Sequence, residues 1–228
     1  EIYVMNADGS GQTRLTQNAY QDEAPTWSRD GSQIAFQSNA GEGGNYEIFV
    51  MDSADGANRV PLTESGSDVW QTEVWQNESP RWSPESVLGD QISFSSYRSQ
   101  RDIYITQLVT PPPGSTPLPG RKLTDLPTDD GTASWSSDGR LMVLESRRSG
   151  DLEIFTVNAD GTNPVRLTHD PGNDRSPSWS RDTTRIVFES DRTGNRDIYI
   201  MDSDGTDLRR LTRHSAHDES PAWAWAPE

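Results

Sequence analysis

The chain of 228 residues contains no cysteine, which excludes disulfide bonds and thiol chemistry. No apolar run approaches the roughly 20 residues that a membrane-spanning helix requires, and only 31% of the residues are hydrophobic. Basic residues are scarce, because 20 Lys and Arg stand against 36 Asp and Glu, for a formal net charge of −16. A negative field of this size repels nucleic-acid phosphates. We therefore expect cations or basic protein segments as partners, with neither nucleic-acid binding nor a membrane span.

Motifs of the common enzyme classes are also missing. The chain has no Gly-x-Ser-x-Gly nucleophile motif and no glycine-rich phosphate loop. Histidine occurs at three positions, His169, His214 and His217, which fall in two successive loops. Metal binding there would require further ligands that the sequence does not identify. The sequence predicts a non-enzymatic protein with no catalytic residues, no metal site and no cofactor.

One segment is repeated five times along the chain. Its fullest copy consists of residues 197–205 (Asp-Ile-Tyr-Ile-Met-Asp-Ser-Asp-Gly), a Leu-Thr pair at 211–212, and Ser-Pro-Ala-Trp at 220–223. The tryptophan of the repeat recurs at Trp27, Trp82, Trp135, Trp179 and Trp223. The last three tryptophans are spaced by 44 residues, from 135 to 179 and from 179 to 223. This period is typical of a four-stranded propeller blade of roughly 40–50 residues.

Each repeat contains four short segments with the composition of strands. In the fourth repeat they are residues 176–180, 185–189, 197–201 and 208–211, bounded by Gly, Asp, Asn and Ser. Apolar spacing of three and four never persists over ten residues, so no substantial helix is predicted. The Asp-x-Asp-Gly segments, such as residues 202–205, lack the length and closing Glu of a calcium loop, which favours hairpin turns. The sequence predicts an all-β chain.

The repeats resemble those of the TolB propeller family over nearly the whole chain. Residues 1–9 (Glu-Ile-Tyr-Val-Met-Asn-Ala-Asp-Gly) and 25–31 (Pro-Thr-Trp-Ser-Arg-Asp-Gly) carry the resemblance. Such repeats occur in periplasmic scaffolds, in propellers attached to peptidases and in some sugar lyases, so the resemblance constrains fold more than function. It implies an exported protein, periplasmic or extracellular. The domain that TolB proteins carry ahead of the propeller is not in this sequence, and an export leader would precede Glu1.

Counting strands predicts that residues 1–228 form a single β-propeller domain with five blades. The chain opens on the third and fourth strands of a blade, runs through four complete blades, and closes on a first strand at residues 220–225. The two termini would then form an incomplete seam blade. Three explanations stay open: a truncated chain, a genuine three-stranded seam blade, or a seam completed by another chain. The last would make the protein an assembling subunit, because an open strand edge is a template for pairing.

The loop before each tryptophan strand is acidic. If the first strands line a central channel, these loops meet at one mouth and form a ring of carboxylates that attracts a cation or a Lys/Arg-rich peptide. The predicted ring consists of Asp22, Glu23, Glu78, Asp129, Asp130, Asp174, Asp218 and Glu219. The alternative is that each acid caps its own turn or pairs with a neighbouring arginine such as Arg81 or Arg175.

Two further features fall outside the acidic ring. Trp70 and Trp75 lie in an extended loop, where they would stack on a sugar, anchor a partner protein, or plug the channel. The arginine-bearing turns suggest repeated ion pairs that lock hairpins, between Arg98, Arg148 and Arg192 and the acids Asp102, Asp151 and Asp197.

Together these features predict a binding or scaffold module that recognises a protein or basic peptide at an acidic channel mouth. One alternative is a self-assembling structural subunit, forming filaments or oligomers through its seam blade. A weaker alternative is the propeller portion of a larger hydrolase or metal-dependent sugar lyase.

Overall fold

The computed structural model describes residues 1–40, 44–63, 76–84, 90–97, 100–108, 120–124 and 128–223. Within these ranges the regular structure consists of strands β1–β18, with no α-helix, which confirms the all-β prediction. In this part of the chain, no helix is present that has the length and apolarity to cross a membrane.

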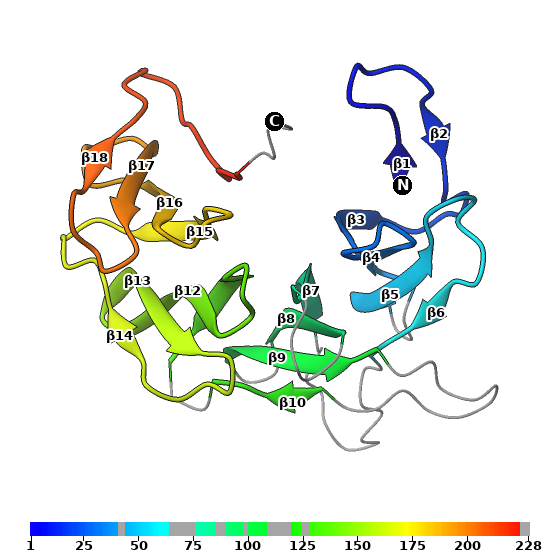
Figure 1. The fold of residues 1–228 in the computed structure, drawn as a ribbon, viewed down its shortest axis with the longest axis horizontal. Coiled ribbons are helices and arrows are strands. Elements are labelled where there is room, and N and C mark those ends of the chain that lie inside the picture. The colour runs from blue at the N-terminus through cyan, green and yellow to red at the C-terminus, as the bar shows by residue number, and fades with distance from the viewer. Residues whose placement is uncertain are drawn as a thin grey trace. The chain divides into compact units, whose positions relative to one another are not determined.

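Four antiparallel sheets have four strands each, and the strands of each sheet follow one another in chain order (Figure 1). The first two sheets comprise β3 (Asp22–Trp27), β4 (Gln33–Ser38), β5 (Glu47–Asp52) and β6 (Val60–Pro61), then β7 (Gln76–Trp82), β8 (Gln91–Tyr97), β9 (Arg101–Gln107) and β10 (Arg121–Lys122). The other two comprise β11 (Asp130–Trp135), β12 (Leu141–Ser149), β13 (Asp151–Asn158) and β14 (Val165–Arg166), then β15 (Asp174–Trp179), β16 (Arg185–Ser190), β17 (Asp197–Asp202) and β18 (Arg209–Arg210). A two-stranded sheet of β1 (Tyr3–Val4) and β2 (Thr13–Arg14) precedes them.

The strands of the fourth repeat confirm the predicted elements, with shifted boundaries. β15 begins two residues earlier than predicted, because Asp174 still pairs with Ser190 of β16. The predicted strand at 220–225 is wrong for residues 220–223, which form no strand. A strand ladder requires a paired neighbour, and residues 224 and 225 lie outside the described residues. The five-blade count therefore stays a prediction.

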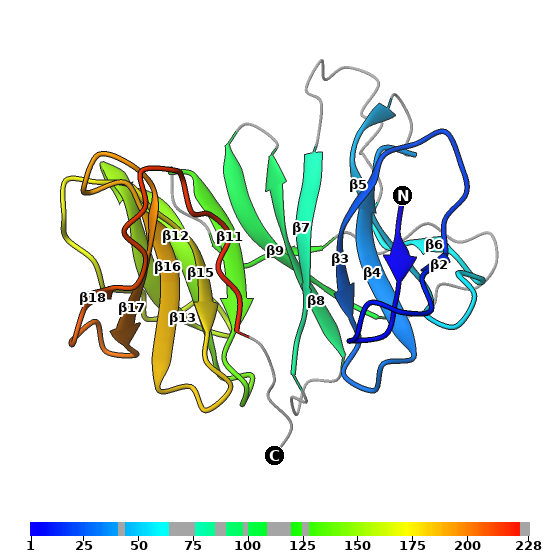
Figure 2. The same cartoon turned by 90° about the horizontal axis from the view of Figure 1, so that it is seen from above.

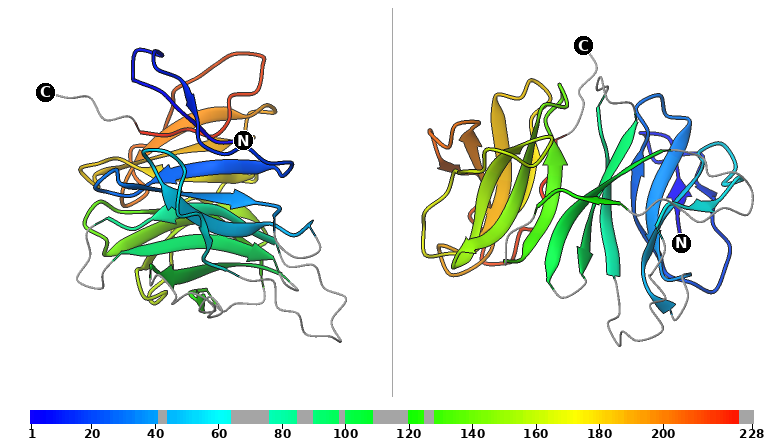
Figure 3. Two further views of the ribbon diagram at one scale, coloured as in Figure 1. Left: turned by 90° about the vertical axis from the view of Figure 1, so that its right-hand side faces the viewer. Right: turned by 90° about the horizontal axis from the view of Figure 1, so that it is seen from below.

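The strands group into two compact units. Unit 1 comprises Glu1–Trp82, Asp90–Ser99 and Tyr104–Arg121, and unit 2 comprises Ser83–Gly89, Gln100–Ile103 and Lys122–Glu228. In unit 1, β7 packs against β3, β4 and β5. In unit 2, β15–β18 run side by side as one sheet (Figure 2), and β15 packs against β11, β12 and β13 of the preceding sheet (Figure 3).

Stacked aromatic side chains from neighbouring strands form part of the hydrophobic core. Phe36 on β4 is fully buried and stacks on Phe49 of β5, with ring centroids 5.9 Å apart. Phe188 on β16 stacks on Tyr199 of β17 in the same way, at 5.8 Å. In β5 and β17 the aromatic of the Asp/Glu-Ile-Tyr segment is therefore a core residue, facing its cross-strand neighbour.

The Asp-Gly turns position neighbouring sheets as well as closing hairpins. In residues 158–161 the Gly161 amide donates to the Asn158 carbonyl at 2.8 Å, which confirms the turn prediction. Gly161 has φ +87°, and a Cβ atom there would lie 2.2 Å from the carbonyl oxygen of Leu123, in the Leu-Thr motif of the preceding repeat. Glycine is therefore required both by the turn conformation and by the contact with the adjacent segment.

We predict that Gly161→Ala lowers the free energy of unfolding by about 2–5 kcal/mol, combining a positive-φ cost of about 1–2 kcal/mol with an overpacking cost of about 1–3 kcal/mol. The matched control is Gly9→Ala, in the identical Asn-Ala-Asp-Gly sequence, because no atom lies within 4 Å of a Cβ atom at Gly9. The control should show only the conformational cost. Equal losses for the two variants in urea denaturation would contradict the contact.

Candidate functional site

The Leu-Thr motif follows the fourth strand of each repeat, and its threonine hydrogen-bonds back to the third strand. In the third complete sheet the Thr168 hydroxyl accepts the N–H of Ile154 at 2.9 Å and donates to Glu153 at 2.6 Å. Arg166 donates to the other oxygen of Glu153 and to the carbonyl of Thr168. The bond from an isoleucine N–H to a threonine hydroxyl recurs at Thr16, Thr63, Thr124 and Thr212. The acid that begins each third strand is therefore an internal brace.

A second buried acid lies at the start of the first strand. Asp174 on β15 is 0% exposed and accepts from Arg192 Nη2 at 2.8 Å. The Arg192 Nε atom donates to Ser190 at 2.9 Å, and its guanidinium carbon lies 4.8 Å from the Tyr199 ring centroid. An ion pair, a hydroxyl and an aromatic face thus satisfy one buried guanidinium.

The same cluster occurs in two other sheets. Asp130 pairs with Arg148 at 2.9 Å, and Arg148 covers Phe155. In the first complete sheet, Ala40 occupies the position equivalent to Arg148, and the cation comes instead from Arg59, in the loop before β6. Arg59 donates to Ser38 at 2.9 Å and lies 3.4 Å from Asp22. A guanidinium therefore lies beside the first-strand acid in all three sheets, although in the first it comes from a different segment of the chain.

These clusters correct the predicted ion pairs. Arg148 and Arg192 pair with first-strand acids rather than with Asp151 and Asp197, because the antiparallel pairing brings the end of the second strand beside the start of the first. Asp197 pairs with Arg210, and Asp102 with Lys122. Arg98 lies outside the described residues.

The eight predicted ring acids fall into two groups. Asp22, Asp130 and Asp174 are at most 2% exposed and bind the arginines described above. These three brace the sheets, as the alternative interpretation anticipated, although through other arginines than Arg81 and Arg175. The remaining five are exposed or half-buried: Glu23, Glu78, Asp129, Asp218 and Glu219. Trp70 and Trp75, the predicted aromatic contact, lie outside the described residues.

In unit 1 one of the exposed group, Glu23, lies beside the hydroxyl of Tyr46. The Tyr46 hydroxyl donates to Gln21 at 2.7 Å and lies 3.5 Å from Glu23. Burial raises the pKa of Tyr46, and the negative charges of Glu23 and Glu78 raise that pKa further. The described contacts of Glu23 are with Tyr46 and, at 3.3 Å, with the amide of Gln37. The Glu23 carboxylate therefore lies among neutral polar groups.

In unit 2 the corresponding acids have donors nearby. Asp129 accepts the N–H of Arg101 at 3.0 Å, and Glu219 pairs with Arg196 at 2.6 Å. Glu145, buried beside them, accepts the N–H of Ser176 at 2.8 Å, and burial raises the pKa of its carboxyl group. The negative field of this surface is partly neutralised by arginine.

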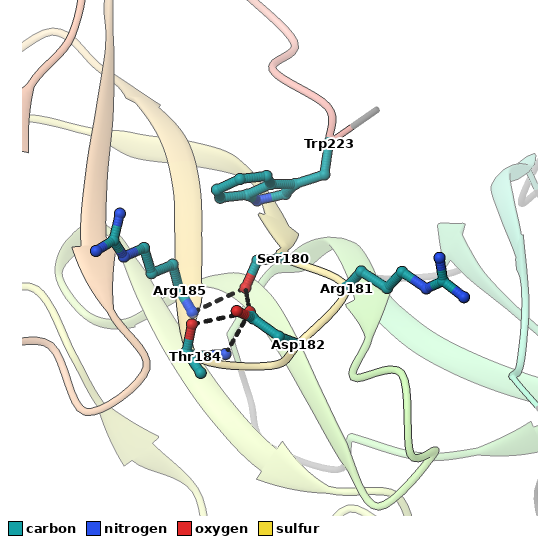
Figure 4. Close-up of a pocket in the computed structure, with 6 residues that line it drawn as sticks. All are labelled: Ser180, Arg181, Asp182, Thr184, Arg185 and Trp223. Atoms are coloured by element: carbon teal, nitrogen blue, oxygen red, sulfur yellow. Dashed lines mark hydrogen bonds between the residues drawn. The ribbon is translucent and has the colours of Figure 1, made fainter. Parts of the chain in front are cut away.

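A cavity of about 550 Å³ lies on unit 2 between Trp223 and the turn after β15 (Figure 4). The Trp223 indole donates to the carbonyl of Ser178 at 3.2 Å, which fixes the ring above the turn. Asp182 accepts from Ser180 at 2.6 Å and from Thr184 at 2.8 Å, and these bonds lower its pKa to about 2. A carboxylate with so low a pKa is a poor general base, so this cavity is suited to binding rather than to proton transfer.

The described residues include no group of three His, Cys, Asp or Glu side chains that could hold a metal ion. Of the histidines, His217 accepts the N–H of Arg196 through Nδ1 at 3.1 Å.

We predict that Arg148→Met lowers the free energy of unfolding by about 3–5 kcal/mol, because it leaves the buried Asp130 carboxylate without its cation. Arg140→Met is the control, since the Arg140 side chain is 86% exposed and lies 4.0 Å from Asp138, a pair worth under about 1 kcal/mol. Adding Asp130→Asn to Arg148→Met should recover part of the loss. A small effect of Arg148→Met in denaturant titrations would refute the brace.

Comparison with known proteins shows where this architecture recurs. The model of the TolB beta propeller domain matches residues 41–227. The chain is 37% identical over 84 residues to the Tol-Pal system protein TolB of Zymomonas mobilis, covering 36% of this chain and 16% of that protein. It is 42% identical over 48 residues to dipeptidyl-peptidase 5 of Porphyromonas gingivalis, covering 21% of this chain and 7% of that protein. These matches span less than a fifth of the relatives' length.

Solved structures share the fold at low identity. A TolB from Acinetobacter baumannii superposes with a TM-score of 0.74 at 22% identity, covering 97% of this chain and 51% of that chain. A putative TolB from Agrobacterium tumefaciens gives 0.72 at 21%, covering 92% and 73%. An oligogalacturonate lyase from Vibrio parahaemolyticus gives 0.62 at 15%, covering 94% and 60%. The repeats, the four-stranded sheets and the match over residues 41–227 lead to one conclusion: the chain belongs to the TolB beta propeller domain family.

Proposed function

We propose that this chain is a non-enzymatic protein-binding module, with residues 1–228 in a single propeller domain, that recognises a basic segment of a partner protein. The observation that carries the proposal is the position of Glu23 in unit 1, 3.5 Å from the Tyr46 hydroxyl. The raised pKa of Tyr46, to which the charges of Glu23 and Glu78 both contribute, agrees with it. Two carboxylates, a phenol oxygen and two glutamine amides provide acceptors for a lysine or arginine side chain. The net charge of −16 adds long-range attraction for such a segment.

The burial of each acid decides whether it can bind the partner segment. A carboxylate that already bonds a buried guanidinium would have to break that ion pair before it could bind a ligand, at a cost of several kcal/mol. Asp22, Asp130 and Asp174 are therefore assigned to the sheets. The ligand-binding set that remains is Glu23, Glu78, Asp129 and Glu219, because the Oδ2 atom of Asp218 is buried.

The location of the protein and its lack of catalysis are proposed with the help of its relatives. The curated relatives include proteins named for the Tol-Pal system, which supports export to the periplasm or the extracellular space. The peptidase and lyase among the similar proteins carry related repeats or the same fold, so fold alone does not decide catalysis. The proposal of a non-enzymatic role rests on the chemistry of the described residues, whose acids serve as turn caps, braces and surface charges.

Self-assembly is the second candidate, and one observation favours it. Tyr3 and Met5 are 58% and 62% exposed, whereas the equivalent Tyr199 and Met201 of β17 are at most 4% exposed. A strand from a second copy would cover these side chains. Light scattering on the binding samples separates this candidate from a monomeric binding module.

We predict that the combined change Glu23→Gln, Glu78→Gln, Asp129→Asn and Glu219→Gln weakens binding of a synthetic Lys/Arg-rich peptide at least tenfold, because it removes four surface charges. The control changes Asp8, Asp55, Asp90 and Asp160 to Asn, at the other ends of their sheets. It removes the same net charge, and asparagine can still cap the turns. Isothermal titration calorimetry at low and moderate salt provides the measurement.

Equal weakening in both variants would mean that net charge alone attracts the peptide, and the proposed site would be wrong. Unchanged binding in the first variant would also refute it. A thermal melt of each variant establishes that the fold is retained before binding is compared.

A further inference from the structure

The acid that begins the third strand is Glu in some repeats and Asp, which is one methylene shorter, in others. The length of this side chain determines which partners its carboxylate reaches. Both oxygens of Glu153 are occupied, one by the Thr168 hydroxyl and one by Arg166. Asp102 occupies the same position in β9 and bonds Lys122 through Oδ2 at 3.0 Å. Its Oδ1 atom is buried and has no hydrogen-bond partner in the protein.

The threonine beside Asp102 also makes fewer described hydrogen bonds than Thr16 and Thr168. The Thr124 hydroxyl accepts the N–H of Ile103 at 3.1 Å, as the equivalent threonines do. Where the acid is Glu, as in Glu1 and Glu153, the threonine also donates to the carboxylate at 2.6 Å. The described contacts of Thr124 include no such bond. The side chain of Asp102 is one methylene shorter than that of Glu153, which accounts for the difference.

A second buried acceptor belongs to Asp130, on the first strand of the next sheet. Asp130 is 0% exposed, and its Oδ1 atom also has no hydrogen-bond partner. The N–H of Arg101 donates to Asp129 at 3.0 Å, which brings the adjacent residues Asp102 and Asp130 close together. In agreement with this, the negative charge of Asp130 adds to the effect of burial in raising the pKa of Asp102. In unit 1 the equivalent residues Glu47 and Asn77 are in direct contact, with Nδ2 donating to Oε2 at 2.8 Å. Two carboxylates cannot make that contact, because neither donates a hydrogen.

We propose that a buried water molecule bridges Asp102 and Asp130. The water donates one hydrogen to each Oδ1 atom and accepts a hydrogen bond from the Thr124 hydroxyl. It thus makes about three hydrogen bonds, as buried waters typically do. Lys122 and Arg148 already balance both carboxylates, so a neutral ligand with two donors fits this site better than a cation. Without such a donor, both buried acceptors would be left unsatisfied, which folded proteins avoid.

The arrangement is repeated where Asp again begins the third strand. Asp197 Oδ1 and Asp218 Oδ2 are both buried without a partner, and the Thr212 hydroxyl accepts the N–H of Ile198. The Asp218 N–H donates to the carbonyl of Arg196 at 2.9 Å, just as Asn77 donates to Tyr46. Beside Glu47 and Glu153 the first-strand residue, Asn77 or Asp174, also has one buried oxygen without a partner. Asp in place of Glu therefore adds a second buried acceptor, and a bridging water requires both.

A pair of opposite substitutions tests the proposal. Asp102→Glu recreates the arrangement of Glu153 and should expel one water, whereas Glu153→Asp should admit one beside Asp174, whose Oδ1 atom also has no partner. High-resolution crystal structures locate the water directly. Oxygen-17 relaxation dispersion of the solvent counts long-lived buried waters in solution, and should fall by one for the first variant and rise by one for the second.

Three results would overturn the proposal. Density bound to six or more oxygens at about 2.3–2.6 Å would identify a calcium ion instead. Direct contact of the two Oδ1 atoms would identify a shared proton. An unchanged water count in both variants would show that the acid does not control the site. Thermal melts of both variants establish folding, so an unfolded sample is not mistaken for a negative result.

Discussion

The fold depends on carboxylates that are buried at the ends of strands and bonded there. An unpaired carboxylate inside a protein is strongly unfavourable, so each one requires a cation or several donors at a defined place. Thr168 and Arg166 meet this requirement for Glu153, and Arg192 meets it for Asp174. Because these partners come from other strands, the acids define which strand ends lie together.

This requirement explains how one chain can vary while its sheets remain alike. Arg59 and Arg148 reach equivalent acids from different elements, since only the position of the guanidinium over the aromatic ring and beside the acid is constrained. Surface acids have no such constraint. Burial therefore divides acidic residues that look alike in the sequence into internal braces and surface charges.

Much of the fold was predictable from the sequence, because strands and Asp-Gly turns are local features with a fixed period. The site was less predictable. Asp22 and Glu23 are adjacent and look equivalent, but alternation along β3 buries one and exposes the other. No local pattern indicates that Arg59 replaces an arginine missing at Ala40, because the two positions meet only after three strands have paired.

The most direct test of the buried brace is native-state hydrogen exchange at the isoleucine that follows each third-strand acid. The account predicts that the amides of Ile48, Ile154 and Ile198, which donate to threonine hydroxyls, exchange only through global unfolding. Exchange of these amides at the rate of the exposed turns would contradict it. Such a result would mean that the acid, threonine and isoleucine do not hold the strands together.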